Sequence, residues 1–323
     1  MMMKNLELLE SCYKLFAKID ANHYQVEYPP FEGAVTVAPK GHDINAKIDF
    51  CLMGITHGNE VVGLDICHYF LEKLANCSLK IDFKFALVLG NVLACGQDKR
   101  FLFSDMNRSM GKKVVSNEEE KRGLLISEHV LKNTRYLLDM HQTIEPTERS
   151  FFIFPYTKDA MSFAAHIDSN RAVVTHWGGG FSKDGMCTDE YVNRHGGVGI
   201  SIEFGQKGYD ENQKADGIRM VEKLIEGFNQ GIDFSKPNVV QEIYTWNEVI
   251  AYPEGEVSLK EGLTNFQKWE AGSSFGVKEG LELSSETGGL IMFPKYVKPG
   301  DLRPKELIRF MKKVDASELP SHG

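Results

Sequence analysis

The stretch AKIDFCLMGITHGNEVVGLDICHYFLEKLA, residues 46–75, joins a strand pattern to a helix pattern through a short polar turn. Residues 46–56 predict a buried strand, and residues 59–75 predict a helix because their apolar side chains recur every three or four positions. His57 and Glu60 therefore fall in a strand-to-helix connection. Connections at the carboxyl ends of strands are where open α/β sheets gather their ligands and catalysts.

The same alternation continues along the next 150 or so residues. Strands are predicted at 83–90, 135–140, 151–154 and 198–204, and helices at 117–133 and 210–228. Such alternation predicts an α/β fold, in which a mixed sheet is sandwiched by helices. His141 follows one predicted strand directly and Glu203 lies at the end of another, so both belong to the same kind of edge as His57.

The sequence changes character near Ser235. Beyond it, short apolar runs are separated by many glycines, a pattern typical of a small all-β unit. We therefore predict two domains: residues 1–235, an α/β domain that begins with an amphipathic helix, and residues 236–323, a small β-rich domain. The stripe of the opening helix consists of Leu6, Leu9, Tyr13, Phe16 and Ile19.

Composition excludes several classes of function. The net charge of -8 argues against a broad nucleic-acid surface. No membrane anchor is expected, because the longest uncharged apolar run, 85–96, is too short to span a bilayer. The N-terminus lacks the features of a signal peptide, which predicts a cytoplasmic protein. The six cysteines form no CxxC pair and are expected to be buried free thiols.

His57 and Glu60 have the spacing of a metal-binding pair. Zinc in hydrolases usually takes about three ligands from His, Asp and Glu and leaves one position for water. A His-x-x-Glu pair can supply two of them from one turn of backbone when a helix begins between the two residues. A single His near a strand end is more often a core residue, but His141 and Glu203 at the ends of two other predicted strands strengthen the interpretation.

Five segments, taken in this order, resemble the succinylglutamate desuccinylase/aspartoacylase family, relatives of the zinc carboxypeptidases. They are His57-Gly-Asn-Glu60, Asn91 through Ala94, Arg100-Phe with Asp105-Met-Asn-Arg108, Asp139-Met-His141, and Glu203-Phe-Gly205. The likeness covers roughly the first 230 residues. Asn91 is not followed by the proline that is frequent in the family, and residues 143–199 match no clear motif.

The resemblance implies one Zn²⁺ per chain, with His57, Glu60 and His141 as its ligands. It makes Glu203 the general base and acid. Physical chemistry agrees with this division, because zinc lowers the pKa of a bound water to about 7 and a nearby carboxylate can accept the proton that is released. The carboxylate can then return that proton to the leaving amine.

The resemblance also implies how a substrate is held. Arg100 corresponds to the arginine that stabilises the oxyanion, and Asn107 and Arg108 correspond to a carboxylate-binding pair. A guanidinium suits this task because its planar fork binds a carboxylate through two parallel hydrogen bonds. A substrate with at least one carboxylate is expected. Asp105 and Asp139 are expected to orient their neighbours.

Other residues are weaker candidates. Tyr191 and Arg194 precede Glu203 where the family can recruit a second anion-binding group, and Tyr296 could reach the cleft from the β-rich domain. His68 is interpreted as structural. The segment from Trp177 to Gly180 is interpreted as a flexible connection.

These observations predict a zinc-dependent hydrolase that cleaves the amide bond of a small N-acyl amino acid. One alternative keeps the metal and changes the substrate: a carboxypeptidase-like metallopeptidase or an esterase that acts on a carboxylate-bearing molecule. The other is a zinc-retaining binding protein, which the presence of both Glu203 and Arg100 disfavours. The acyl group, the amino acid, the metal carried in the cell and a homo-oligomeric state are left open, since such a ligand set also accepts cobalt, manganese or nickel.

Overall fold

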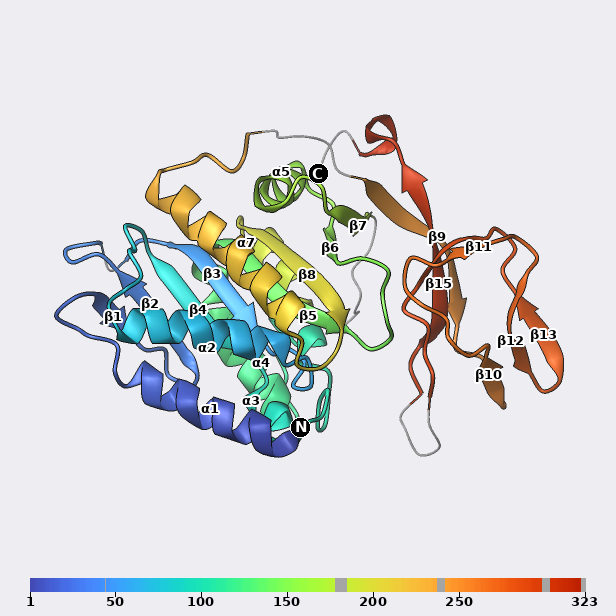
Figure 1. Ribbon diagram of the computed structural model, residues 1–323, viewed down its shortest axis with the longest axis horizontal. Coiled ribbons are helices and arrows are strands. Elements are labelled where there is room, and N and C mark those ends of the chain that lie inside the picture. The colour runs from blue at the N-terminus through green and yellow to red at the C-terminus, as the bar shows by residue number, and fades with distance from the viewer. Residues whose placement is uncertain (44, 178–184, 237–241, 298–302, 321–323) are drawn as a thin grey trace.

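A twelve-stranded mixed sheet runs through the molecule, and a separate three-stranded sheet lies at the end formed by the C-terminal residues (Figure 1). The computed structural model describes residues 1–43, 45–177, 185–236, 242–297 and 303–320. In spatial order, the large sheet consists of β1 (Gln25–Glu27), β2 (Ala34–Ala38), β4 (Phe85–Leu89), β3 (Ile48–Gly54), β5 (Thr134–Thr143), β8 (Val198–Gln206), β6 (Phe151–Pro155), β7 (Ala172–His176), β9 (Ile243–Ala251), β15 (Glu306–Val314), β14 (Gly289–Met292) and β11 (Lys268–Trp269). The small sheet consists of β10 (Val257–Leu259), β12 (Ser274–Lys278) and β13 (Leu281–Ser284).

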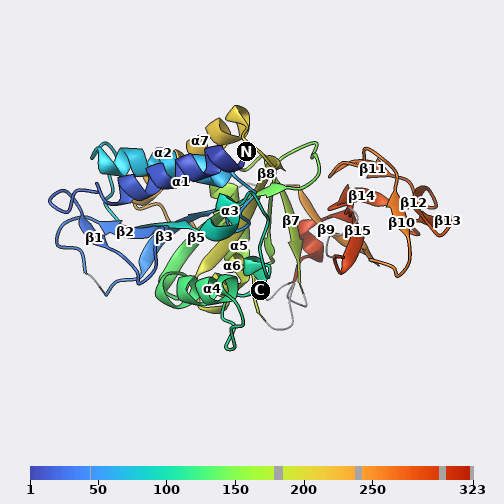
Figure 2. The same cartoon turned by 90° about the horizontal axis from the view of Figure 1, so that it is seen from below.

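Helices cover both faces of the large sheet. The α-helices are α1 (Met2–Phe16), α2 (Val62–Ala75), α3 (Val92–Gly96), α4 (Glu118–His129), α5 (Lys158–Ile167), α6 (Thr188–Arg194) and α7 (Glu211–Asn229). Short 3-10 helices are η1 (Met106–Arg108), η2 (Leu131–Asn133) and η3 (Ala316–Glu318). Figure 2 shows α1, α2 and α7 on one face and α4 and α6 on the other. The predicted α/β sandwich is confirmed.

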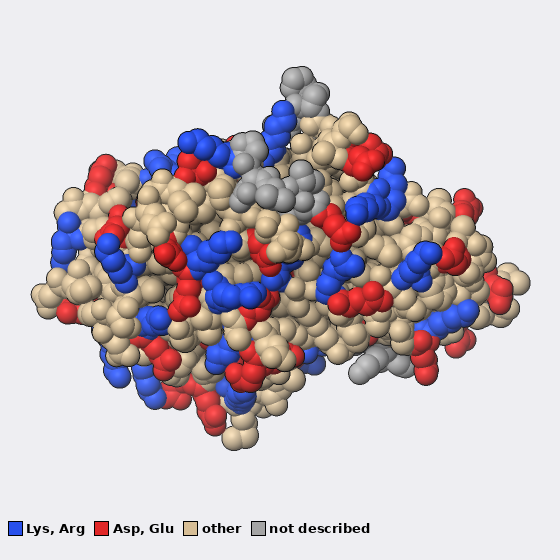
Figure 3. Space-filling model, turned by 45° about the horizontal axis from the view of Figure 1, so that its top comes forward, with Lys and Arg blue, Asp and Glu red and all other residues tan. Residues whose placement is uncertain are grey.

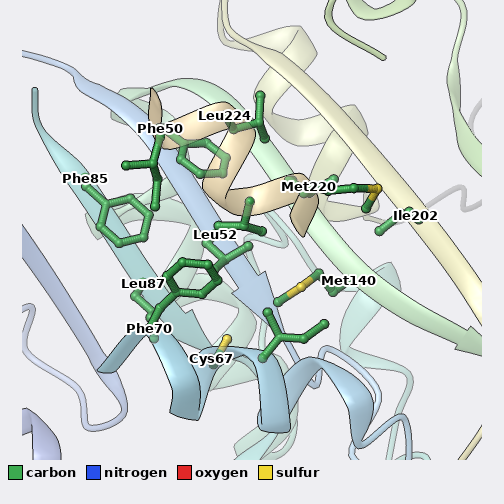
Figure 4. Close-up of a cluster of buried hydrophobic side chains, with 14 of the residues drawn as sticks. Phe50, Leu52, Cys67, Phe70, Phe85, Leu87, Met140, Ile202, Met220 and Leu224 are labelled. Atoms are coloured by element: carbon green, nitrogen blue, oxygen red, sulfur yellow. The ribbon is translucent and has the colours of Figure 1, made fainter. Parts of the chain in front are cut away.

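The alternation of side chains along β3 builds two cores. Phe50 and Leu52 point toward α2 and α7 and pack in the cluster that includes Phe70 and Leu224 (Figure 4). Cys51, between them in sequence, belongs to the cluster on the opposite face. Successive strand residues face opposite sides, so a nearly continuous apolar strand is buried on both. This explains why β3 could be recognised from its composition.

The predicted strands and helices of the first 230 residues are observed, with ends that differ by a few residues. Two details were wrong. Leu6 of the opening helix is 48% exposed, and its stripe is completed instead by the buried Cys12. Helix α2 begins at Val62, so no helix starts between His57 and Glu60. The chain instead bends at Ile55, whose φ is +52°, and both side chains project from an irregular turn.

The C-terminal strands continue the large sheet. β9 pairs with β7 in parallel, and β15, β14 and β11 add to it in antiparallel fashion. The predicted β-rich character of this part is therefore observed, while residues 237–241, beside the predicted domain boundary, lie outside the described residues. The boundary at 235/236 stays a prediction.

The charged surface and the cysteines agree with what the composition predicts. On the face shown in Figure 3, Lys and Arg side chains are interspersed with Asp and Glu. All six cysteines are free, and all but the partly exposed Cys77 are buried. Within the described ranges, no helix combines the length and the apolar character that a bilayer crossing requires.

Candidate active site

Three side chains converge at the carboxyl ends of β3 and β5. His57 and Glu60 come from the turn after β3, and His141 comes from the last part of β5. Nδ1 of His57 lies 2.9 Å from Oε1 of Glu60, and Nδ1 of His141 lies 2.9 Å from Oε2 of the same carboxylate. The two Nδ1 atoms are 3.2 Å apart. All three residues are buried.

The sheet and a glycine together create this arrangement. β3 and β5 are neighbouring parallel strands, with Gly54 beside Met140, so the residues that follow them emerge at one edge. Gly58, between the two predicted ligands of the turn, packs against the backbone of α3. A Cβ atom there would lie 2.3 Å from the amide nitrogen of Cys95, which leaves room for glycine alone.

The donor set fits a zinc ion. Ligand atoms at tetrahedral angles and bonds of about 2.0–2.1 Å would lie about 3.3 Å apart, and the closest separations here are 2.9–3.2 Å. His141 Nε2 lies 2.9 Å from Asp139 Oδ2, so a proton on Nε2 leaves the Nδ1 lone pair for a metal. Although burial opposes ionisation of Glu60, the charge on His57 and hydrogen bonds with His141 and His57 hold its pKa well below the usual value.

Two aspartates hold the histidines. Asp139 accepts hydrogen bonds from Thr56 Oγ1 at 2.8 Å and from Thr188 Oγ1 at 2.6 Å, in addition to its contact with His141. Asp105 Oδ1 lies 3.1 Å from His57 Nε2. Because a histidine ring is oriented by the partner of its outward nitrogen, these contacts agree with the expected orienting role of both aspartates.

Glu203 lies beside His141 on β8. In the parallel pairing of β5 and β8 the two residues are register partners, and the side chains of such partners face the same side of a sheet. Glu203 Oε2 is buried and has no hydrogen-bond partner among the described residues. Burial first, and the charge of Glu60 second, raise the pKa of Glu203 to about 7. A buried carboxylate oxygen without a partner is unusual and is placed to interact with a ligand or a water molecule.

Arg100 reaches the same donor atoms from a different loop. Its Nη1 donates to Glu60 Oε1 at 2.7 Å, and its Nη2 lies 2.9 Å from His57 Nε2. The backbone of this loop is attached to the turn of His57, since Gly58 N donates to the Arg100 carbonyl at 3.0 Å. The predicted oxyanion-stabilising residue is thus adjacent to the predicted metal ligands.

Asn107 and Arg108 lie in the 3-10 helix η1, which Asp105 caps by accepting a hydrogen bond from Asn107 N at 2.9 Å. Asn107 Oδ1 accepts from Thr188 N at 3.0 Å, so the amide group has a fixed orientation. Arg108 Nη1 donates to the Asn107 carbonyl at 2.7 Å and contacts Cys187 Sγ at 3.1 Å. Although burial opposes its charge, Cys187 and acidic neighbours raise the pKa of Arg108, which therefore stays cationic.

Glu119 is a residue that sequence reasoning missed. Only 1% exposed, it comes from α4 and anchors the loop of Arg100. Its Oε1 accepts from Leu102 N at 2.8 Å, and its Oε2 accepts from Phe103 N at 2.7 Å and Ser104 N at 2.9 Å. The family-like Asn91 also donates to it, at 2.6 Å. An acidic residue in the first turn of a helix suggests only a favourable interaction with the helix dipole, so no local pattern signals this role.

We expect Glu119→Gln to lower kcat/KM by about 10- to 100-fold, because an amide NH₂ would face backbone N–H groups and shift Arg100 and η1. Metal content should be unchanged, since His57, Glu60 and His141 come from other segments. Steady-state kinetics with metal analysis would measure both. The matched control is Glu120→Gln, whose carboxylate instead bonds Lys112 and Ser116. Equal losses in the two variants would contradict the positioning role.

The weaker candidates lie outside this cluster. Tyr191 is buried, stacks on His195 and donates to Glu128. Arg194 has an exposed side chain and forms an ion pair with the buried Glu190. Tyr296 donates to the Lys260 carbonyl, within the C-terminal strands.

Two further interpretations concern residues away from the cluster. His68 bonds Ser11 on the neighbouring helix, which confirms its structural interpretation. The predicted connection from Trp177 to Gly180 falls, apart from Trp177 itself, outside the described residues.

Comparisons with known proteins agree with the fold and the motifs. The catalytic-domain model of the succinylglutamate desuccinylase/aspartoacylase family matches residues 46–231. A succinylglutamate desuccinylase from Pseudomonas paraeruginosa is 24% identical over 285 residues, covering 81% of this chain and 84% of that protein. The crystal structure of the Chromobacterium violaceum succinylglutamate desuccinylase superposes with a TM-score of 0.69 at 17% identity, covering 96% of this chain and 98% of the other. For murine aminoacylase 3 the TM-score is 0.63 at 19% identity, with 84% and 98% covered.

The fold and the motif order therefore define an α/β protein built like these hydrolases. The family match spans more than half of the chain. The chain belongs to the succinylglutamate desuccinylase/aspartoacylase family.

Proposed function

We propose that this protein is a zinc-dependent hydrolase that cleaves the amide bond of a small N-acyl amino acid. The observation that carries the proposal is the convergence of two imidazole nitrogens and a carboxylate, with Arg100 in contact with them. Beside them lies a Glu203 oxygen that has no hydrogen-bond partner among the described residues. Family membership supports the same class of reaction, and relatives named succinylglutamate desuccinylase or aminoacylase point to N-acyl amino acids as substrates.

In this proposal, His57, Glu60 and His141 hold one Zn²⁺. The ion supplies a water of lowered pKa and a Lewis acid for the substrate carbonyl. Glu203 accepts the proton of the attacking water at its Oε2 and gives it to the leaving amine, which requires a carboxylate whose pKa is near the working pH. Its buried position, with a pKa raised to about 7, agrees with that requirement.

Arg100 and Arg108 bind different anionic groups of the substrate in this proposal: the developing oxyanion and a carboxylate. Arg100, beside the metal ligands, donates to the carbonyl oxygen as negative charge develops there, and such preorganised donors contribute a few kcal/mol. Arg108 binds a carboxylate of the substrate, with the Asn107 amide group as a second donor. The burial of Met106 and Asn107 in η1 supports a fixed position for this pair.

The first experiment is elemental analysis of the purified protein, paired with hydrolysis of N-acetyl and N-succinyl amino acids before and after chelation. We expect near-stoichiometric zinc and a free amino acid whose release stops on chelation and returns with added zinc. Zinc without release of an amino acid from any substrate in the panel would exclude the proposed reaction and favour a peptide, an ester or a binding role. Failure to bind any divalent metal would exclude the site itself.

A further inference from the structure

Lys295 belongs to the C-terminal strands, yet its backbone is joined to the catalytic part of the fold. Its amide donates to the Leu307 carbonyl of β15 at 2.9 Å. Two residues earlier, Phe293 N donates to Asn265 Oδ1 at 2.7 Å. Asn265, 1% exposed, donates through Nδ2 to the carbonyl of Pro146 at 3.0 Å, in the connection that follows β5. Asn265 therefore joins the segment of Lys295 to the connection that follows β5, the strand of His141.

A chain of aromatic contacts leads from Glu203 to Lys295. In the antiparallel pairing of β6 and β8, Phe151 is the register partner of Glu203, so their side chains share one face of the sheet. The ring of Phe151 lies 6.2 Å from that of Phe293, centroid to centroid. Lys295 Nζ lies 5.2 Å from the centroid of the Phe293 ring. The ammonium thus lies at the end of a row of rings that begins beside Glu203.

The ammonium of Lys295 lies in an environment that disfavours its charge. Burial first, and the neighbouring Arg100 second, lower its pKa to about 8, while Glu203 acts in the opposite direction. Within the described residues it forms no ion pair, and its close contact is the Phe293 ring. Glu306 is also near, but its carboxylate lies 2.6 Å from Arg309. A partly buried cation without an anionic partner is costly, so a ligand with negative charge would relieve the cost.

We propose, on the basis of the proposed function, that Lys295 is a substrate-contacting residue that binds a second anionic group of the N-acyl amino acid, apart from the carboxylate at Arg108. The C-terminal strands would then contribute directly to specificity. The preferred substrate would carry two carboxylates placed so that one meets Arg108 and the other meets Lys295. Replacing one of them by a neutral amide should remove the contribution of Lys295 and leave that of Arg108.

The test compares N-acylglutamates with the isosteric N-acylglutamines, in both the N-acetyl and the N-succinyl series. We expect Lys295→Met to raise KM for the preferred glutamate substrate about tenfold or more and to leave KM for its glutamine counterpart nearly unchanged. Lys295→Arg should restore much of the preference. The matched control is Lys268→Met, which removes an exposed lysine of β11 that pairs with Glu270.

Binding gives a readout that needs no turnover. Titration calorimetry should show that the zinc-loaded wild type binds succinate more tightly than succinamate, and that Lys295→Met reduces this difference. An unchanged glutamate-to-glutamine preference in Lys295→Met would refute the inference, as would an equal loss of kcat for both substrates, since Lys295 would then act through Glu203. If the wild type cleaves no amide, the proposed function fails, and the succinate titration still decides whether Lys295 binds an anion.

Discussion

Glu203→Gln should lower kcat by a factor of about 10²–10⁴ while the protein keeps its zinc. The amide has nearly the same shape as the carboxylate, so the environment beside His141 would be preserved, but it cannot accept a proton from water. The atom that the change disables is the buried Oε2, which has no partner in the part of the chain that the structure describes. Steady-state kinetics on the best substrate of the panel, with metal analysis of the same preparation, would measure the effect.

The chain offers a closely matched control. Glu190, on α6, is also a buried glutamate whose Oε2 lacks a hydrogen-bond partner among the described residues, and it lies outside the predicted site. We expect Glu190→Gln to change kcat less than threefold or so, within the range of ordinary substitutions away from the chemistry. Full turnover in Glu203→Gln with zinc bound would remove the general-base assignment.

The pH dependence gives a second measure of the same residue. A general base must be ionised, so kcat/KM should rise with pH as Glu203 loses its proton. Its pKa is raised to about 7 by burial and by Glu60. A bound divalent cation favours the charged carboxylate and would move this acidic limb below pH 7. The limb should disappear from the small residual activity of Glu203→Gln, because the amide does not titrate.

A residue's role could be predicted from the sequence only where the local pattern of residues reveals it. His57, His141 and Glu203 stand at the ends of strongly apolar strands, and parallel strands place such ends at one edge, so their proximity could be predicted. The local form of the turn could not. The left-handed conformation at Ile55 and the contact of Gly58 with α3 arise from tertiary packing that periodicity does not encode.

The residues that were missed act over long sequence separations. Glu119 anchors Arg100's loop by accepting backbone hydrogen bonds, which leave no motif in the sequence. The proposed contact of Lys295 with the substrate depends on a tertiary link, since Asn265 joins the C-terminal strands to the connection after β5. A glycine-rich β pattern predicts strands, but it does not predict which existing strand they will extend.

His141→Ala should reduce zinc affinity by more than about 100-fold, the upper range for losing merely an outer partner of a ligand. Turnover should fall to background at limiting zinc. The variant should still fold, because the buried Asp139 keeps its hydrogen bonds from Thr56 and Thr188 after the imidazole is removed. Competition with a chromophoric chelator would measure the affinity, and circular dichroism would check the fold.

His68→Ala is the control for His141→Ala, because it removes a histidine that is not a predicted metal ligand. His68 lies on α2, close in sequence to Glu60, but its ring bonds Ser11 rather than the predicted site. This variant should bind zinc as the wild type does, with at most a small loss of stability. If His141→Ala and His68→Ala retained the same zinc affinity, the ion would bind elsewhere, and the contacts of His141 with Asp139 and Glu60 would be structural.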